Sequence, residues 1–197
     1  MDRARDSSDP GRPATVLAAM RLEKLALGGR VVRIGMGHRR AIAAAEGLAA
    51  SLAPGAPVVL AGISGGLDPG LRPGELVVAT SVRGPDGDET PLPAGDAAAV
   101  AGALRAGGRS VHLGPVVSSR TLVHGERRAE LARSGALAVD MESAWVAAAL
   151  AATRLVIVRV VADTAGNVVV GLVKGLVALR GVRGALDGWP GPSAASG

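Results

Sequence analysis

Three acidic residues stand at the ends of predicted strands, the positions where side chains of an α/β protein usually meet a ligand. Glu23 follows the first apolar run, Glu142 follows ALAVDM and Asp163 follows RLVIVRVVA. Carboxyl groups can protonate a departing base, stabilise a sugar that becomes cationic and orient a nucleophile. Breaking the bond between a ribose and a purine needs all of these actions. We therefore expect the three carboxyls to share one pocket.

Each acid also has a simpler interpretation when it is taken alone. Glu142 could favour the N-terminus of a helix, Asp163 could cap the segment that follows it, and Glu23 could be a surface charge. Because all three stand beside strand ends, the joint interpretation is favoured over three unrelated ones.

Two glycine-rich segments follow predicted strands. In GMGHRRA (35–41), backbone amides with Arg39 and Arg40 could receive an anion, or the segment could be a tight turn. This segment approximates a dinucleotide fingerprint with Arg40 in place of the third glycine, so a Rossmann-type dinucleotide-binding protein is an alternative from another class. In GISGGLDPGLRPGELVVA (62–79), Gly65 and Gly66 permit close approach of the backbone to a ligand.

Short runs rich in Val, Ile and Leu predict a series of strands, at 14–19, 30–36, 57–63, 75–82, 110–117, 136–141 and 154–162. Several are apolar at consecutive positions, as in strands buried on both faces. Helical patterns are found at 39–53, 96–106 and 142–152. A last helix, ending near Trp189, is predicted from leucines near one face, namely Leu172, Leu176, Leu179 and Leu186. The segment 84–96 is predicted to be a long loop of low order. This alternation favours a mainly parallel sheet covered by helices.

Composition narrows the class of protein. The 197 residues fit one compact domain, which we expect over 14–189 with disordered tails at 1–13 and 190–197. Cysteine is absent and the His residues lack metal-ligand spacing, so we expect no metal site and a reducing cytoplasmic location. The net charge of +5 is scattered along the chain without interleaved aromatic residues, which argues against a nucleic-acid partner. The apolar runs are too short to span a membrane.

The motifs AMRLE (19–23), GMGHRRA, GISGGLDPGLRPGELVVA, AVDMESAWVAAA (138–149) and RVVADTA (159–165) occur in one order. In this order the chain resembles the purine nucleoside phosphorylase and uridine phosphorylase superfamily, and GGLDPGLRPGELVVA is similar to the hopanoid-associated phosphorylases. The resemblance implies a three-layer α/β phosphorylase/hydrolase-like fold, with a central, mainly parallel, twisted mixed sheet flanked by helices. It also implies a homo-oligomer.

The activity implied by this resemblance is cleavage of an N-glycosidic bond in a small-molecule purine nucleoside. The substrate suggested is adenosylhopane, which would lose adenine and would require peripheral contact with a membrane. Futalosine, or methylthioadenosine with S-adenosylhomocysteine, are alternatives within the family. No cofactor is implied, and phosphate enters only as a co-substrate of phosphorolysis.

The resemblance also implies roles for individual residues. Asp163 would protonate the leaving purine, Met141 and Glu142 would bind ribose, and Glu23 would activate water. In addition, Arg159 would orient the site, while Gly65 and Gly66 would line the sugar or nucleophile pocket.

The chain departs from the family pattern at three points. Ile63 stands where relatives often carry a Ser or Thr that binds phosphate or sugar, which disfavours phosphorolysis. Ala162 replaces a Ser found in nucleosidases, and Phe and Tyr are absent, so aliphatic side chains would have to pack against the base. A nucleoside-binding module that has lost turnover is therefore a further alternative.

Overall fold

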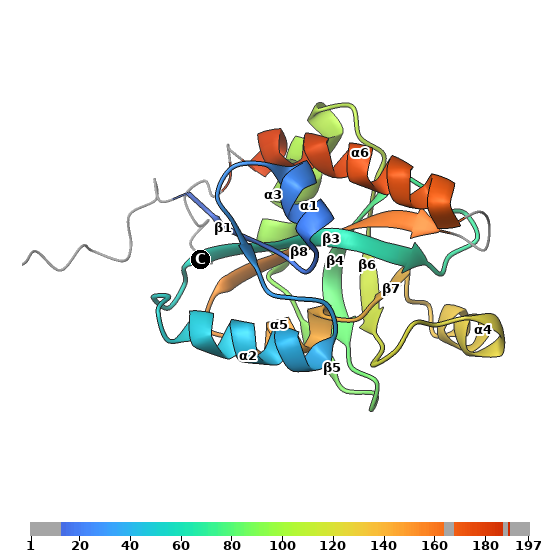
Figure 1. The fold of residues 1–197 in the computed structure, drawn as a ribbon, viewed down its shortest axis with the longest axis horizontal. Helices are drawn as coiled ribbons and strands as arrows, with labels where there is room; N and C mark the ends of the chain where they lie inside the picture. Colours follow the sequence, from blue (N-terminus) through green and yellow to red (C-terminus); the bar gives the residue numbers. More distant parts are fainter. Residues whose placement is uncertain (1–12, 164–167, 187–188, 190–197) are drawn as a thin grey trace, which may run out of the picture.

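Strands and helices alternate along the chain (Figure 1) in the computed structural model, which describes residues 13–163, 168–186 and 189. The strands are β1 (Thr15–Ala18), β2 (Val31–Arg33), β3 (Pro57–Gly66), β4 (Leu76–Arg83), β5 (Glu89–Pro91), β6 (Val111–Ser118), β7 (Ala138–Asp140) and β8 (Arg154–Asp163). The helices are α1 (Arg21–Leu27), α2 (His38–Ala49), α3 (Ala94–Ala106), α4 (Gly125–Arg133), α5 (Ser143–Ala149) and α6 (Val168–Leu186). Apart from the exposed Pro13, the predicted disordered tails lie outside the described residues.

The strands form one mixed sheet that closes on itself. Its order is β2-β1-β3-β7-β6-β4-β5, with β8 pairing with both β3 and β4. The longest pairing is parallel, between β3 and β8, whereas β4 runs antiparallel to β8. Pairings therefore run from β3 through β8, β4, β6 and β7 back to β3. The predicted mixed, mainly parallel sheet is confirmed, and its closure depends on a contact of only two residue pairs between β3 and β7.

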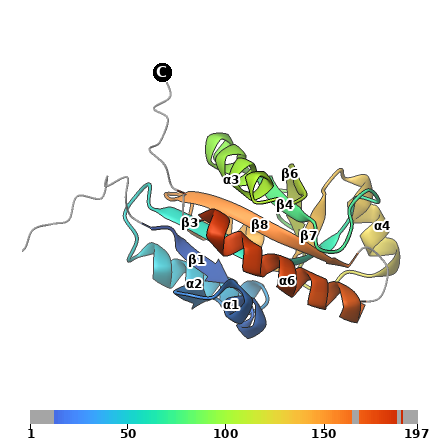
Figure 2. The ribbon, with the colours of Figure 1, turned by 90° about the horizontal axis from the view of Figure 1, so that it is seen from above.

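Helices cover both faces of the sheet and create three layers. In Figure 1, α2 and α5 lie on one side of the sheet, while α1, α3 and α6 lie on the other; Figure 2 shows α6 running along β3 and β8. Consecutive residues of β3 enter opposite layers, because Val58 and Leu60 pack toward α2 and α5, and Val59 and Ala61 pack toward α3 and α6. The run of apolar residues in this strand thus reflects burial on both faces.

The sequence prediction was wrong for the segment 84–96. Residues Glu89–Pro91 form β5, which pairs antiparallel with β4, and α3 begins at Ala94. A turn makes this return possible, since the Gly84 amide donates to the Asp88 carbonyl at 2.8 Å. Helices α1 and α4 were not predicted, because both are short and α4 has no buried residue to produce an apolar period.

Helix α6 packs its apolar face on the end of β8. Leu179 and Leu186 are buried as predicted, Leu172 and Leu176 are half-buried, and the helix ends before the expected Trp189. A side chain at Gly171 would overlap the carbonyl of Ala162, so glycine allows this close approach. Among the helices described, none combines the length and apolar character needed to cross a membrane.

Candidate active site

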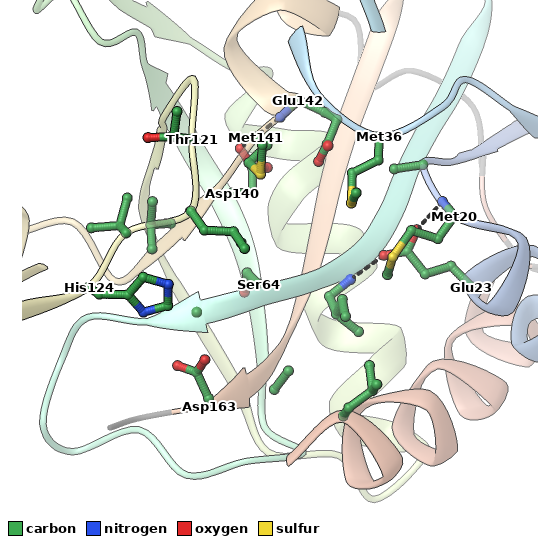
Figure 3. Close-up of a pocket in the computed structure, with 18 of the residues that line it drawn as sticks. Met20, Glu23, Met36, Ser64, Thr121, His124, Asp140, Met141, Glu142 and Asp163 are labelled. Atoms are coloured by element: carbon green, nitrogen blue, oxygen red, sulfur yellow. Dashed lines mark hydrogen bonds between the residues drawn. The ribbon is translucent and has the colours of Figure 1, made fainter. Parts of the chain in front are cut away.

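A cavity of about 230 Å³ lies where β3, β7 and β8 end (Figure 3). All three acids predicted from the sequence, Glu23, Glu142 and Asp163, line it. The structure therefore brings together three side chains that are separated by up to 140 positions in the sequence. The remaining lining is mostly apolar and includes Met20, Met36, Ile63, Leu122, Val123, Val139, Met141, Ala162 and Leu172.

Glu23 is held in a fixed orientation inside the protein. It is 1% exposed, and its carboxylate accepts hydrogen bonds from the backbone amides of Met20, at 2.7 Å, and Ile63, at 2.8 Å. Burial raises the pKa of Glu23, while these hydrogen bonds and Arg159 partly oppose that effect. The interpretation of Glu23 as a surface charge is wrong. Its environment instead suits a base that accepts and retains a proton.

Glu142 precedes the first residue of α5 and is also buried. Its Oε1 accepts a hydrogen bond from the Gly37 amide at 2.8 Å, and Oε2 lies 3.9 Å from Nη2 of Arg159. Burial raises the pKa of Glu142; Arg159 opposes this increase and Asp140 adds to it. The Gly37 amide in the glycine-rich turn 35–37 thus donates a hydrogen bond to a carboxylate of the protein. This amide is therefore not free to bind the anion that the sequence suggested.

Asp163 is the last residue of β8 and forms an ion pair. Nη2 of Arg128, in α4, lies 2.6 Å from Asp163 Oδ1. The same nitrogen donates to the carbonyl oxygens of Gly66, at 2.6 Å, and Asp163, at 3.0 Å. Arg128 thereby connects the ends of β3 and β8. Of the two predicted glycines, Gly65 lines the cavity, whereas Gly66 does not line it and contacts Arg128.

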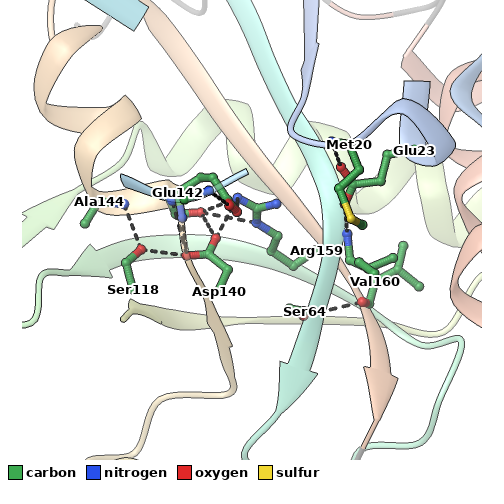
Figure 4. A network of polar contacts seen from close by, with 12 residues as sticks. Met20, Glu23, Ser64, Ser118, Asp140, Glu142, Ala144, Arg159 and Val160 are labelled. Carbon is green, nitrogen blue, oxygen red and sulfur yellow. Dashed lines mark hydrogen bonds and ion pairs between the residues drawn. The ribbon is translucent and has the colours of Figure 1, made fainter. Parts of the chain in front are cut away.

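Arg159 lies behind the cavity in a buried polar network (Figure 4). It is 0% exposed, its Nη2 lies 2.6 Å from Asp140 Oδ2, and its Nε and Nη2 donate to Ser143 Oγ. The Ser118 hydroxyl donates to Asp140 at 2.6 Å. This network connects β6, β7, β8 and α5, and so fixes the backbone that carries Met141 into the cavity. Arg159 can orient the site from there without lining it.

Several lining residues were missed in the sequence. Asp140 stands beside the predicted Met141 and Glu142, so the motif AVDMES could have suggested it. Arg128 gave no signal because it lies in α4, a helix with no buried residue, and the segment 121–124 gave none because it is an irregular loop. Leu122 is 74% exposed and Met36 is 53% exposed, which places an apolar rim on the cavity.

Metal chemistry was not expected from the sequence. In the part of the chain that the structure describes, no group of three or more His, Asp or Glu side chains could hold a metal ion. The chemical groups gathered at the cavity are carboxyls, the Arg128 guanidinium and the His124 ring, which can act by proton transfer and electrostatics.

Comparison with known proteins gives a consistent result. The family model described as phosphorylase superfamily matches residues 26–171. A search of curated proteins gives no significant match. A variant of methylthioadenosine nucleosidase from Helicobacter pylori, with 5′-methylthioadenosine in its active site, is similar with a TM-score of 0.77 at 18% identity, covering 90% of this chain and 99% of that chain.

Two further structures have the same architecture. Futalosine hydrolase of Helicobacter pylori has a TM-score of 0.77 at 17% identity, covering 89% of this chain and 97% of that chain. The 5′-methylthioadenosine/S-adenosylhomocysteine nucleosidase of Neisseria meningitidis has a TM-score of 0.73 at 21% identity, with coverage of 89% and 97%. At these identities the likeness establishes the fold, so the predicted three-layer phosphorylase-type architecture is confirmed.

Proposed function

The chain belongs to the phosphorylase superfamily, and on that premise we propose that it breaks the N-glycosidic bond of a purine nucleoside-like substrate and releases the base. The observation that carries this proposal is the convergence of Glu23, Glu142 and Asp163 on one cavity. Such a reaction needs a proton for the base, stabilisation of a cationic sugar and an activated nucleophile. The three carboxyls can divide these tasks.

Asp163 is assigned to the base. It lies at one end of the cavity, away from Glu23 (Figure 3). As the bond between ribose and purine breaks, its electrons pass to the purine. Asp163, after it has taken up a proton from water, transfers that proton to a ring nitrogen, and the carboxylate that results is the form that pairs with Arg128. Arg128 holds this carboxyl at the ends of β3 and β8, so the base meets a group whose position is already set.

Glu142 and Met141 are assigned to the ribose. Met141 presents an apolar surface to the sugar, and Glu142 can accept hydrogen bonds from its hydroxyls. When the sugar becomes cationic, Glu142 and the neighbouring Asp140 place negative charge close to it, in a site largely screened from water. Before a cationic sugar forms, Arg159 offsets part of the negative charge of Asp140 and Glu142.

Glu23 is assigned to the nucleophile, which we take to be water. Water would attack the sugar carbon and transfer its proton to Glu23, whose pKa is raised by burial. The Ile63 amide donates to Glu23 and is therefore not free to bind phosphate. The occupied Ile63 amide favours hydrolysis over phosphorolysis.

The lining also bears on the substrate. Aliphatic and thioether side chains would pack against the base in place of aromatic residues. The rim formed by Met36 and Leu122 is also apolar. An apolar substituent on the sugar fits such a lining. The candidates are adenosylhopane, with contact between this rim and a membrane, methylthioadenosine, S-adenosylhomocysteine and futalosine. Self-association remains a prediction from the sequence resemblance.

Release of free base tests the proposal. The purified chain is incubated with each of the four compounds, with and without inorganic phosphate, and bases and sugars are separated by chromatography. We expect free base and a reducing sugar at a rate that does not depend on phosphate. A sugar 1-phosphate as the product would instead assign phosphorolysis.

Matched variants connect the activity to the cavity. Asp163→Asn should lower kcat by about a hundredfold or more, the range for loss of a general acid. Asp86→Asn, at an exposed ion pair with Arg120, makes the same chemical change outside the cavity and should retain the activity. Full activity of the Asp163 variant would remove its catalytic role. Saturable binding of all four compounds without turnover would instead support the binding-module alternative.

A further inference from the structure

A strongly basic hollow adjoins the cavity on the side of Glu23. It has a volume of about 800 Å³ and continues into a smaller hollow of about 460 Å³. Their cationic lining residues come from α1, β2 and α2; we call them the basic groove, comprising Arg21, Lys24, Arg33 and Arg40. The two hollows share Arg21 and Arg33, so the positive charge is continuous between them.

Within the described parts of the chain, no carboxylate lines either hollow. Among the described residues, none of the four basic-groove side chains makes an ion pair or a side-chain hydrogen bond. Other arginines of this chain are paired, for example Arg120 with Asp86 and Arg127 with Glu130. Four like charges gathered without a counter-ion repel one another, and an anionic ligand would relieve that repulsion.

The basic groove lies in line with the cavity. The larger hollow and the cavity share Ala19, Met20 and Met36. In Figure 3, Met20 and Met36 lie across the cavity from Asp163. A substrate whose base contacts Asp163 and whose sugar contacts Glu142 therefore directs its sugar substituent past the two methionines toward the basic groove.

We propose that the substrate carries an anionic group, a carboxylate or a phosphate, at the outer end of its sugar substituent, and that the basic groove binds this group. The proposal rests on the proposed function, because that function sets the direction of the substrate. The substituent is apolar where it passes Met20 and Met36, and anionic beyond them. This favours a carboxylate-bearing nucleoside over adenosylhopane, whose substituent ends in hydrocarbon.

The expected preference is moderate. Exposed ion pairs are individually weak and are screened by salt. Several of them acting on one anion should raise kcat/KM by about tenfold relative to an uncharged group of the same shape. The preference should decrease as the ionic strength increases.

The test uses two 5′-alkylthioadenosines of equal length, one ending in a carboxylate and the other in a carboxamide. For both compounds, adenine release gives kcat/KM, and calorimetry on chains that also carry Asp163→Asn, which slows cleavage, gives Kd. We expect the wild-type chain to prefer the carboxylate by about tenfold. Arg33→Gln combined with Arg40→Gln should reduce the ratio of the two kcat/KM values toward one. Arg39→Gln, next to Arg40 but outside the hollow, is the control and should leave the ratio unchanged.

The possible outcomes separate this inference from the proposed function. Equal kcat/KM values for the two compounds overturn the anion site and leave the glycosidic cleavage intact. Tighter binding of the carboxylate, lost in the double variant, supports the basic groove even if neither compound releases adenine, in which case the proposed function fails. If Arg39→Gln lowers the preference for the carboxylate as much as the double variant does, net charge explains the preference, and the inference is overturned.

Discussion

The guanidinium of Arg128 and the carboxylate of Asp163 form an ion pair, with 2.6 Å between Nη2 and Oδ1. These residues come from α4 and from the end of β8, and the same guanidinium also binds the carbonyl of Gly66 at the end of β3. A helix that has no fully buried residue is thereby connected to the side chain assigned to the leaving base. The position of Asp163 should depend on this one arginine.

Arg128→Ala should lower kcat/KM by about tenfold to a hundredfold, because a displaced catalytic group loses its alignment with the substrate. Steady-state kinetics of base release measures this effect. Arg127→Ala provides the control, since Arg127 is the preceding residue of α4 and pairs only with the exposed Glu130 among the described side chains. Equal kinetics for the two variants would contradict the positioning role.

Arg159→Met should destabilise the fold by about 3–5 kcal/mol, because it leaves Asp140 buried without its cation. Urea unfolding followed by circular dichroism measures this change. Arg120→Met breaks an ion pair whose partners are both exposed and should change the free energy of unfolding by about 0–1 kcal/mol. A loss below about 1 kcal/mol for the Arg159 variant would show that the network does not require its charge.

Much of this fold can be predicted from the sequence because its strands have few alternatives. Apolar β-branched runs such as 57–63 and 154–162 are typical of buried strands, and both predictions are confirmed. The closed sheet could not be predicted, since it depends on a short pairing between Gly65–Gly66 and Ala138–Val139. Local sequence carries no information about such a distant contact.

Some residues of the candidate site could likewise be predicted from the sequence, and others could not. Glu23, Glu142 and Asp163 could be identified because each stands next to a strand or motif, and the structure places all three in one cavity. Arg128 could not, because α4 buries no residue and its sequence does not distinguish the inward Arg128 from the exposed Arg127. The basic groove combines three elements, so only the folded chain reveals it.

Gly62→Ala should impair both stability and activity. A Cβ at this position would lie 2.5 Å from Arg159 Nη1 and 2.8 Å from Glu23 Oε1, and neither side chain has room to move. Such overpacking costs about 1–3 kcal/mol and would displace Glu23 from its backbone donors. Gly47→Ala, in α2, is the control: its added methyl meets open space and should stabilise the helix by about 0.5–1 kcal/mol. A fully active and stable Gly62 variant would mean that the space between Arg159 and Glu23 is not filled as described.

The stability of the fold should depend on the protonation of Glu142. Burial raises its pKa in the folded chain above the ordinary value of 4.5, so the folded chain binds this proton more tightly than the unfolded chain does. Stability is therefore greater when Glu142 is protonated, and it falls as the pH rises from about 4.5 to the raised pKa, by up to about 1.4 kcal/mol per pH unit.

Glu142→Gln removes this dependence, whereas the contribution of Glu23 remains in both chains. The melting temperature of the variant minus that of the wild type should consequently increase as the pH rises through this window. Glu130→Gln, at an exposed position in α4, removes the same charge from the surface and separates burial from net charge. If the difference in melting temperature from the wild type changes with pH equally in both variants, net charge causes the pH dependence. If only the Glu142 variant changes, the cavity holds the carboxylate that we assign to the ribose at a cost in stability, which binding of a cationic sugar would offset.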